Sequence, residues 1–146
     1  MSKTDLAEKL IPEIESQTSI RILAREETQE SVVLLFNNEA PFCADVSDSC
    51  VEIIYGDDSD DFFASTYKSE LAFISSVVSF LKRLSENELM YEYVYYKETL
   101  LRYKVWSIGK NNDKHLIKRV SVSRKCFFKK KSLRKVSKHM TLIQRD

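Results

Sequence analysis

The segment from residue 67 to residue 85 places the tightest constraint on the fold. At 100° per residue, its polar side chains, from Lys68 to Arg83, fill one arc of about 120°, and apolar side chains fill the rest. A helix with so wide an apolar surface must be covered on most sides. The sequence therefore predicts a central helix over residues 67–85 that packs on one face of a sheet.

Short β-branched or alternating segments supply strands on both sides of this helix. The predicted strands are 19–25, 31–37, 50–55, 90–96, 99–106 and 115–123. Residues 38–49 are a predicted loop, and residues 56–61 are a predicted acidic turn. No repeat or linker interrupts the order, so we expect a single α+β domain over residues 1–146, with an antiparallel sheet of about five to seven strands.

Both ends of the chain show helical spacing. At the start, Ser2 or Thr4 can cap a helix, and Pro12 predicts either a kink or a second short helix that begins there. Near the end, apolar side chains recur every three or four residues among clustered basic ones. We therefore expect a basic amphipathic segment over residues 127–146 that forms a short helix.

Charge is divided along the sequence. Residues 1–98 hold 8 Lys and Arg against 20 Asp and Glu, whereas residues 99–146 hold 15 against 2. Between Arg25 and Lys68 there are eleven acidic residues and no basic one. A block of one sign attracts partners of the opposite sign, so the acidic block predicts a basic partner.

Composition excludes several kinds of active site. With only Gly56 and Gly109, the chain has no glycine-rich loop for phosphates or dinucleotides. Its three cysteines and two histidines lack metal-ligand spacing, and no nucleophile stands at a recognisable spacing from a base. We expect a non-enzymatic protein without cofactor or metal. Because no apolar run has the length of a signal peptide or a membrane span, we expect it in the cytoplasm and off the membrane.

The residues Tyr55–Gly56–Asp57–Asp58 match the Y-x-D-D string of metal-binding aspartates in polymerases. A chain of 146 residues has no room for the other domains of such an enzyme. The alternation of Asp57, Ser59 and Asp61 starts like a calcium loop but lacks the glycine and glutamate that complete one. We interpret this interval as an acidic surface turn.

The leading hypothesis is a small binding protein that occludes a basic partner, as an immunity protein, an antitoxin or an anti-defence inhibitor does with a nuclease. A rigid acidic face in a basic cleft gives fast and specific association. The predicted partner-binding residues are Asp45, Asp48, Asp57, Asp58, Asp60 and Asp61.

The alternative is a nucleic-acid-binding protein that acts through the basic C-terminal segment. Its predicted phosphate-binding residues are Lys129, Lys130, Lys131, Arg134, Lys135 and Lys138. A third arrangement has the two charge blocks paired with each other, within one chain or between neighbouring copies.

The predicted hairpin has two distinct faces if Lys97 and Glu98 form its turn. Met90, Glu92, Val94 and Tyr96 then share a core face with Leu101, Tyr103 and Val105. On the other face, Tyr91, Tyr93 and Tyr95 lie with Leu100, Arg102, Lys104 and Trp106. This second face resembles a platform for stacked bases, but we interpret it as an ordinary sheet face with cation–π pairs.

Overall fold

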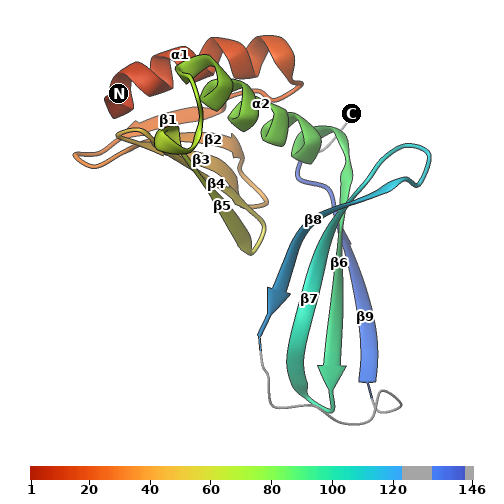
Figure 1. Cartoon of the computed structure of the whole chain (residues 1–146). Coiled ribbons are helices and arrows are strands. Elements are labelled where there is room, and N and C mark those ends of the chain that lie inside the picture. Colours follow the sequence, from red (N-terminus) through yellow and green to blue (C-terminus); the bar gives the residue numbers. More distant parts are fainter. Residues whose placement is uncertain (123–132, 144–146) are drawn as a thin grey trace. The chain divides into compact units, whose positions relative to one another are not determined.

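The computed structural model of the chain describes residues 1–122 and 133–143 (Figure 1). It is an α+β structure with two antiparallel sheets and two α-helices. The described residues form two compact units. Unit 1 consists of Met1–Glu86 and the end of the chain from Leu142, and unit 2 consists of Asn87–Thr141.

The elements of unit 1 are α1 (Lys3–Gln17), β1 (Ala24–Glu27), β2 (Val32–Asn37), β3 (Phe42–Ser47), β4 (Cys50–Tyr55), β5 (Asp58–Phe63), a 3-10 turn (Ala64–Thr66) and α2 (Glu70–Glu86). Those of unit 2 are β6 (Glu88–Tyr96), β7 (Thr99–Ile108), β8 (Lys114–Ser121) and β9 (Leu133–Met140). The strands of unit 1 form sheet A, in the order β1-β2-β3-β4-β5. The strands of unit 2 form sheet B, in the order β8-β7-β6-β9.

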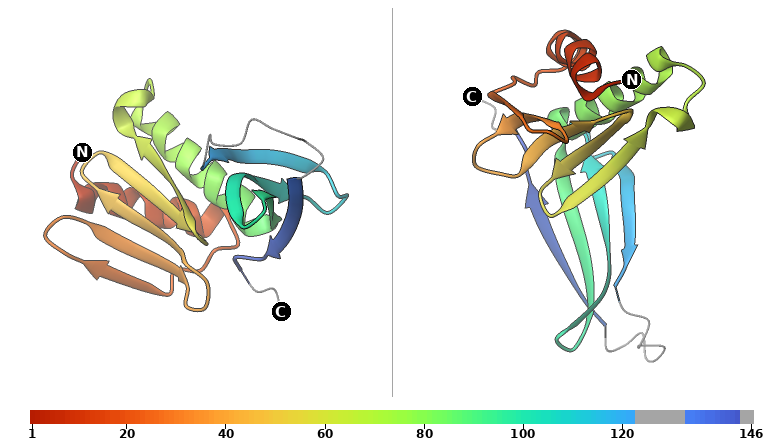
Figure 2. Two further views of the ribbon diagram at one scale, coloured as in Figure 1. Left: turned by 90° about the horizontal axis from the view of Figure 1, so that it is seen from below. Right: turned by 90° about the vertical axis from the view of Figure 1, so that its left-hand side faces the viewer.

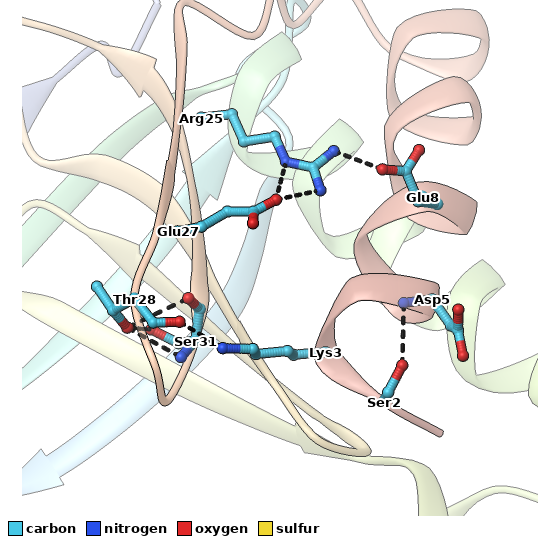
Figure 3. A network of polar contacts seen from close by, with 8 residues as sticks. All are labelled: Ser2, Lys3, Asp5, Glu8, Arg25, Glu27, Thr28 and Ser31. Carbon is cyan, nitrogen blue, oxygen red and sulfur yellow. Dashed lines mark hydrogen bonds and ion pairs between the residues drawn. The ribbon is translucent and has the colours of Figure 1, made fainter.

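Helix α1 begins at one of the two predicted caps. Ser2 Oγ accepts a hydrogen bond from the N–H of Asp5 at 3.2 Å (Figure 3), which satisfies one of the open donors of the first turn. The helix then continues through Pro12, so residues 3–17 form one helix rather than two.

Arg25 connects the first edge strand of sheet A to helix α1. Its guanidinium lies 2.7 Å from a carboxylate oxygen of Glu8 in α1 and 2.6 Å from one of Glu27 in β1 (Figure 3). Both carboxylates are more than half exposed. Such surface pairs contribute little to stability, so the position of α1 depends mainly on apolar burial.

Sheet A buries one face beneath both helices (Figures 1 and 2). Strands β2, β3 and β4 alternate buried and half-buried residues along their length. The buried side chains of this inner face are Val32, Leu34, Phe36, Phe42, Ala44, Val46, Val51, Ile53 and Tyr55. The helices add Leu6, Leu10, Ile14, Phe73, Val77, Leu81 and Leu84. Burial of each large apolar side chain stabilises the fold by about 1.5–3 kcal/mol.

Sheet B is built on the hairpin of β6 and β7. The chain turns at Lys97, whose φ is 53°, as the predicted two-residue turn requires. A register shift beyond Tyr95 then pairs Val94 with Arg102 and leaves Leu101 as the extra residue of a bulge. Because a shift by one residue exchanges the two faces of a strand, the predicted pairing of faces is wrong. Arg102, Lys104 and Trp106 of β7 therefore lie on the face opposite to Tyr91 and Tyr93, and Tyr103 is the aromatic residue of β7 that packs against these tyrosines.

The α+β class is confirmed, and its arrangement differs from the prediction. The described strands form two sheets of five and four strands, not one sheet of five to seven. The predicted helix over 67–85 exists as α2 but is not a single central helix, because α1 lies beside it on the inner face of sheet A (Figure 1).

Two predicted loops of unit 1 contain strands. Strand β3 occupies half of the predicted loop 38–49, and its alternation of buried and half-buried residues is regular. Strand β5 occupies most of the predicted acidic turn, where it pairs with β4 from Asp58 to Phe63. Backbone hydrogen bonds to β4 outweigh the low strand propensity of aspartate there.

The predicted C-terminal helix is a strand over its described part. Strand β9 pairs with β6 along its whole length, from Leu133 opposite Tyr96 to Met140 opposite Leu89. Without it β6 would have an open edge, and pairing of that edge overrides the helical spacing of the tail. The rest of the segment 127–146 lies outside the described residues, apart from 141–143.

Candidate functional site

The division of charge follows the division into units. Unit 1 has 8 Lys and Arg against 18 Asp and Glu, and unit 2 has 15 against 4. Each unit therefore has its own electrostatic field and favours a ligand of the opposite sign.

The outer face of sheet A is the face that neither α1 nor α2 covers (Figure 2). Its side chains alternate with the buried ones along β2, β3 and β4 and are half-buried. Its apolar members include Val33, Leu35, Cys43, Cys50, Ile54 and Phe63. Phe63 at the end of β5 is 51% exposed. The outer face is therefore partly apolar.

Three carboxylates lie in register across this face. Asp45 of β3 is opposite Glu52 of β4, which is opposite Asp61 of β5. Cβ atoms of such partners are about 4.5–5.5 Å apart, where like charges repel and destabilise a sheet. Glu26 of β1 extends the line beyond Val33. We call Glu26, Asp45, Glu52 and Asp61 the acidic row.

The carboxylate of Asp45 is incompletely satisfied. Its Oδ1 is buried, and no hydrogen-bond partner for this atom lies among the described residues. A buried acceptor without a donor costs free energy.

Two thiols on the same face are poor nucleophiles. Burial raises the pKa of the Cys43 thiol, and the charges of Asp45 and Glu52 raise it further. Burial also raises the pKa of Cys50, with Asp61 acting in the same direction. Because the thiolate is the reactive form, neither cysteine is activated. Within residues 1–122 and 133–143, no cluster of three or more His, Cys, Asp or Glu could hold a metal ion.

The structure separates the six predicted partner-binding residues. Asp45 and Asp61 belong to the acidic row, and Asp57 is exposed in the turn between β4 and β5. Asp48 accepts a hydrogen bond from the backbone N–H of Lys3 at 2.8 Å. It therefore helps to hold the start of α1.

The other two predicted residues lie on the inner face. Asp58 is opposite Tyr55 and only 7% exposed, and Asp60 accepts a hydrogen bond from the Tyr55 hydroxyl. Glu26 and Glu52 are missing from the predicted set. The signal for Glu52 was present, because it stands between the apolar residues Val51 and Ile53 of an alternating strand.

The predicted nucleic-acid-binding residues do not share one face. Lys129, Lys130 and Lys131 lie outside the described residues, and Arg134, Lys135 and Lys138 are exposed on β9. Lys135 is opposite Val94, whereas Arg134 is opposite Tyr95 and Lys138 is on the same face as Arg134. The guanidinium carbon of Arg134 lies 4.9 Å from the centre of the Tyr95 ring.

No protein-family model, curated protein or solved structure matches this chain. None of the helices that the structure describes is long and apolar enough to cross a membrane.

Proposed function

We propose that this protein binds a basic protein through the outer face of sheet A and blocks that protein without catalysing a reaction. The observation that carries the proposal is the acidic row. Three of its carboxylates, Asp45, Glu52 and Asp61, stand opposite one another on neighbouring strands, which weakens the free protein. Lysine and arginine side chains of a partner would remove that repulsion on binding.

The apolar surroundings of the row support a protein as the ligand. Protein interfaces combine a desolvated apolar centre with polar residues around it. Here Ile54 is two residues from Glu52 on the same face of β4, Leu35 is two residues from Val33, which is opposite Asp45, and Phe63 is an exposed aromatic side chain at the edge. A small inorganic cation would not use these apolar groups.

A nuclease or another protein with a basic cleft fits this surface best. The cleft of a nuclease is basic because its lysine and arginine side chains bind phosphates. Carboxylates at the spacing of neighbouring strands can compete with phosphates for these side chains. An immunity protein, an antitoxin or an anti-defence inhibitor acts in this way. The proposed role is occlusion of such a cleft.

The test compares two variants with equal change of charge. The face variant carries Asp45→Asn, Glu52→Gln and Asp61→Asn, and it spares Asp58 and Asp60, whose positions are internal. The control variant carries Glu13→Gln, Glu15→Gln and Glu30→Gln, none of which lies on the outer face. Partners are captured from the native cells, identified and purified, and their association rates are measured at low and high salt.

We expect the captured partner to be basic and its association with the wild type to slow as salt rises. The face variant should associate on the order of tenfold more slowly while its melting temperature stays equal or rises. The control variant should behave as the wild type. Equal rates for both variants, or an acidic partner, would refute the proposal.

A further inference from the structure

Sheet B has a basic face that the proposed function does not use. The bulge in β7 places Arg102, Lys104 and Trp106 on the same face as Val94. The neighbouring strands complete the set, which we call the Trp106 face. Its charged and aromatic members are Arg102, Lys104, Trp106, Lys114, Arg119, Lys135, His139, Glu88 and Glu92. Five of these are Lys or Arg and only two are carboxylates.

The cations of this face gather around the single tryptophan of the chain. Trp106 is half-buried, and the ammonium groups of Lys104 and Lys114 lie 5.8 Å and 5.7 Å from its ring centre. One of the two carboxylates, Glu88, is already engaged, because its Oε1 lies 2.8 Å from Nδ1 of His139.

A small hollow beside these groups is lined mainly by charged side chains. Its volume is about 50 Å³, and its lining residues are Glu92, Val94, Arg102, Tyr103, Lys104 and Lys135. Three cations thus face one carboxylate, Glu92, which leaves an excess of positive charge at a concave point of the sheet. Such a point focuses the field on an anion.

We infer that the Trp106 face binds single-stranded nucleic acid. A base would stack on the indole of Trp106, and the phosphates on either side would contact Lys104, Arg102 and Lys135. Sheet surfaces that combine aromatic rings with basic side chains bind single strands in this way, whereas a duplex conceals the faces of its bases. An acidic protein is negatively charged, as a nucleic acid is, but it has no regular series of planar bases that could stack on the indole of Trp106.

This inference is independent of the proposed function. The two surfaces belong to different units and carry opposite charge. Loss of one activity by substitution therefore leaves the other measurable in the same protein.

The first experiment uses Trp106 as the probe. Because the chain has one tryptophan, its fluorescence reports on this face alone. We expect an oligothymidylate of about 12 nucleotides to quench the emission of the full-length protein at low salt. The logarithm of the binding constant should fall linearly with the logarithm of the salt concentration. The slope of this line should be about −0.7 for each phosphate contact.

The second experiment uses a matched pair of lysines in one strand. Lys135 and Lys138 are both exposed on β9 but lie on opposite faces. Lys135→Gln should weaken binding and reduce the salt slope by about 0.7, whereas Lys138→Gln should leave the slope unchanged. Equal effects of the two substitutions would show that only net charge matters and would overturn the inference.

The third experiment separates stacking from charge. With a fluorescently labelled oligothymidylate, Trp106→Leu should lower affinity about tenfold, and Trp106→Phe should restore most of it. Thermal melts confirm that each variant is folded. Polyglutamate of similar length should bind far more weakly than the oligonucleotide. Equal binding of polyglutamate, or no loss of affinity in Trp106→Leu, would refute a nucleic-acid site.

Discussion

At the scale of the residue, Cys43 reports the electrostatics of the outer face. Its raised pKa predicts slower alkylation by iodoacetamide than in the unfolded chain at the same pH, with half-maximal reactivity at higher pH. The folded state holds this proton more tightly. The contribution of Cys43 to stability is therefore present below the unfolded thiol pKa and is lost as pH rises toward the folded value.

The cause of this shift can be tested by removing one neighbour. Glu52→Gln should lower the pKa of Cys43 and speed its alkylation, because the charge of Glu52 opposes ionisation. Glu30→Gln is the control, since Glu30 is exposed in the turn before β2. Peptide mapping by mass spectrometry distinguishes the cysteines. An unchanged rate in Glu52→Gln would contradict the geometry of the acidic row.

Single residues also mark the limits of what sequence patterns predict. The Ser2 cap and the turn at Lys97 follow from local backbone chemistry, and the structure confirms both. The bulge at Leu101 does not, because nothing in the residues of β7 marks which of them is left unpaired. That choice depends on the twist of the whole sheet. The position of this bulge determines which side chains of β7 lie on the Trp106 face.

At the scale of the element, β4 allows a direct test of which face is covered. Ile53 is fully buried beneath the helices, and its neighbour Ile54 is half-buried on the outer face. Ile53→Ala should lower the free energy of unfolding by about 2–5 kcal/mol. Ile54→Ala should lower it by less than about 1 kcal/mol. Urea denaturation measures both, and equal losses would mean that the outer face is also part of the core.

Elements defined by their own residues were predicted better than elements defined by a neighbour. Strand β4 and helix α2 have internal periodicity, and their predicted bounds agree with the structure to within a few residues. Strands β5 and β9 are rich in charge and become strands because β4 and β6 present open edges. No local pattern contains that information. The acidic row depends on β5 and was for that reason only partly predicted.

At the scale of the whole molecule, the change in the sign of charge and the boundary between the two units fall at nearby positions of the sequence. The sign of charge changes near residue 98, and the boundary between the units lies between Glu86 and Asn87. The expectation of one core did not anticipate two compact units, because hydrophobic periodicity does not show which strands pair with which. The two units carry opposite net charge, and the two proposed ligands differ in charge accordingly.

The end of the chain returns to unit 1 after unit 2 is complete. Leu142 is fully buried there, and its carbonyl oxygen accepts a hydrogen bond from the side-chain amide of Asn37. Unit 2 is therefore an insertion whose closure contributes to the stability of unit 1. Leu142→Ala should lower the free energy of unfolding of unit 1 by about 2–5 kcal/mol.

Native-state hydrogen exchange can assign this loss to the correct unit. Amides of β2 and β3 should lose protection in Leu142→Ala, and amides of β6 and β7 should keep theirs if the two units open separately. Ile143→Ala is the control, because Ile143 is only half-buried and should cost less than about 1 kcal/mol. Uniform loss of protection across both sheets would instead show that the two units unfold together as one cooperative structure.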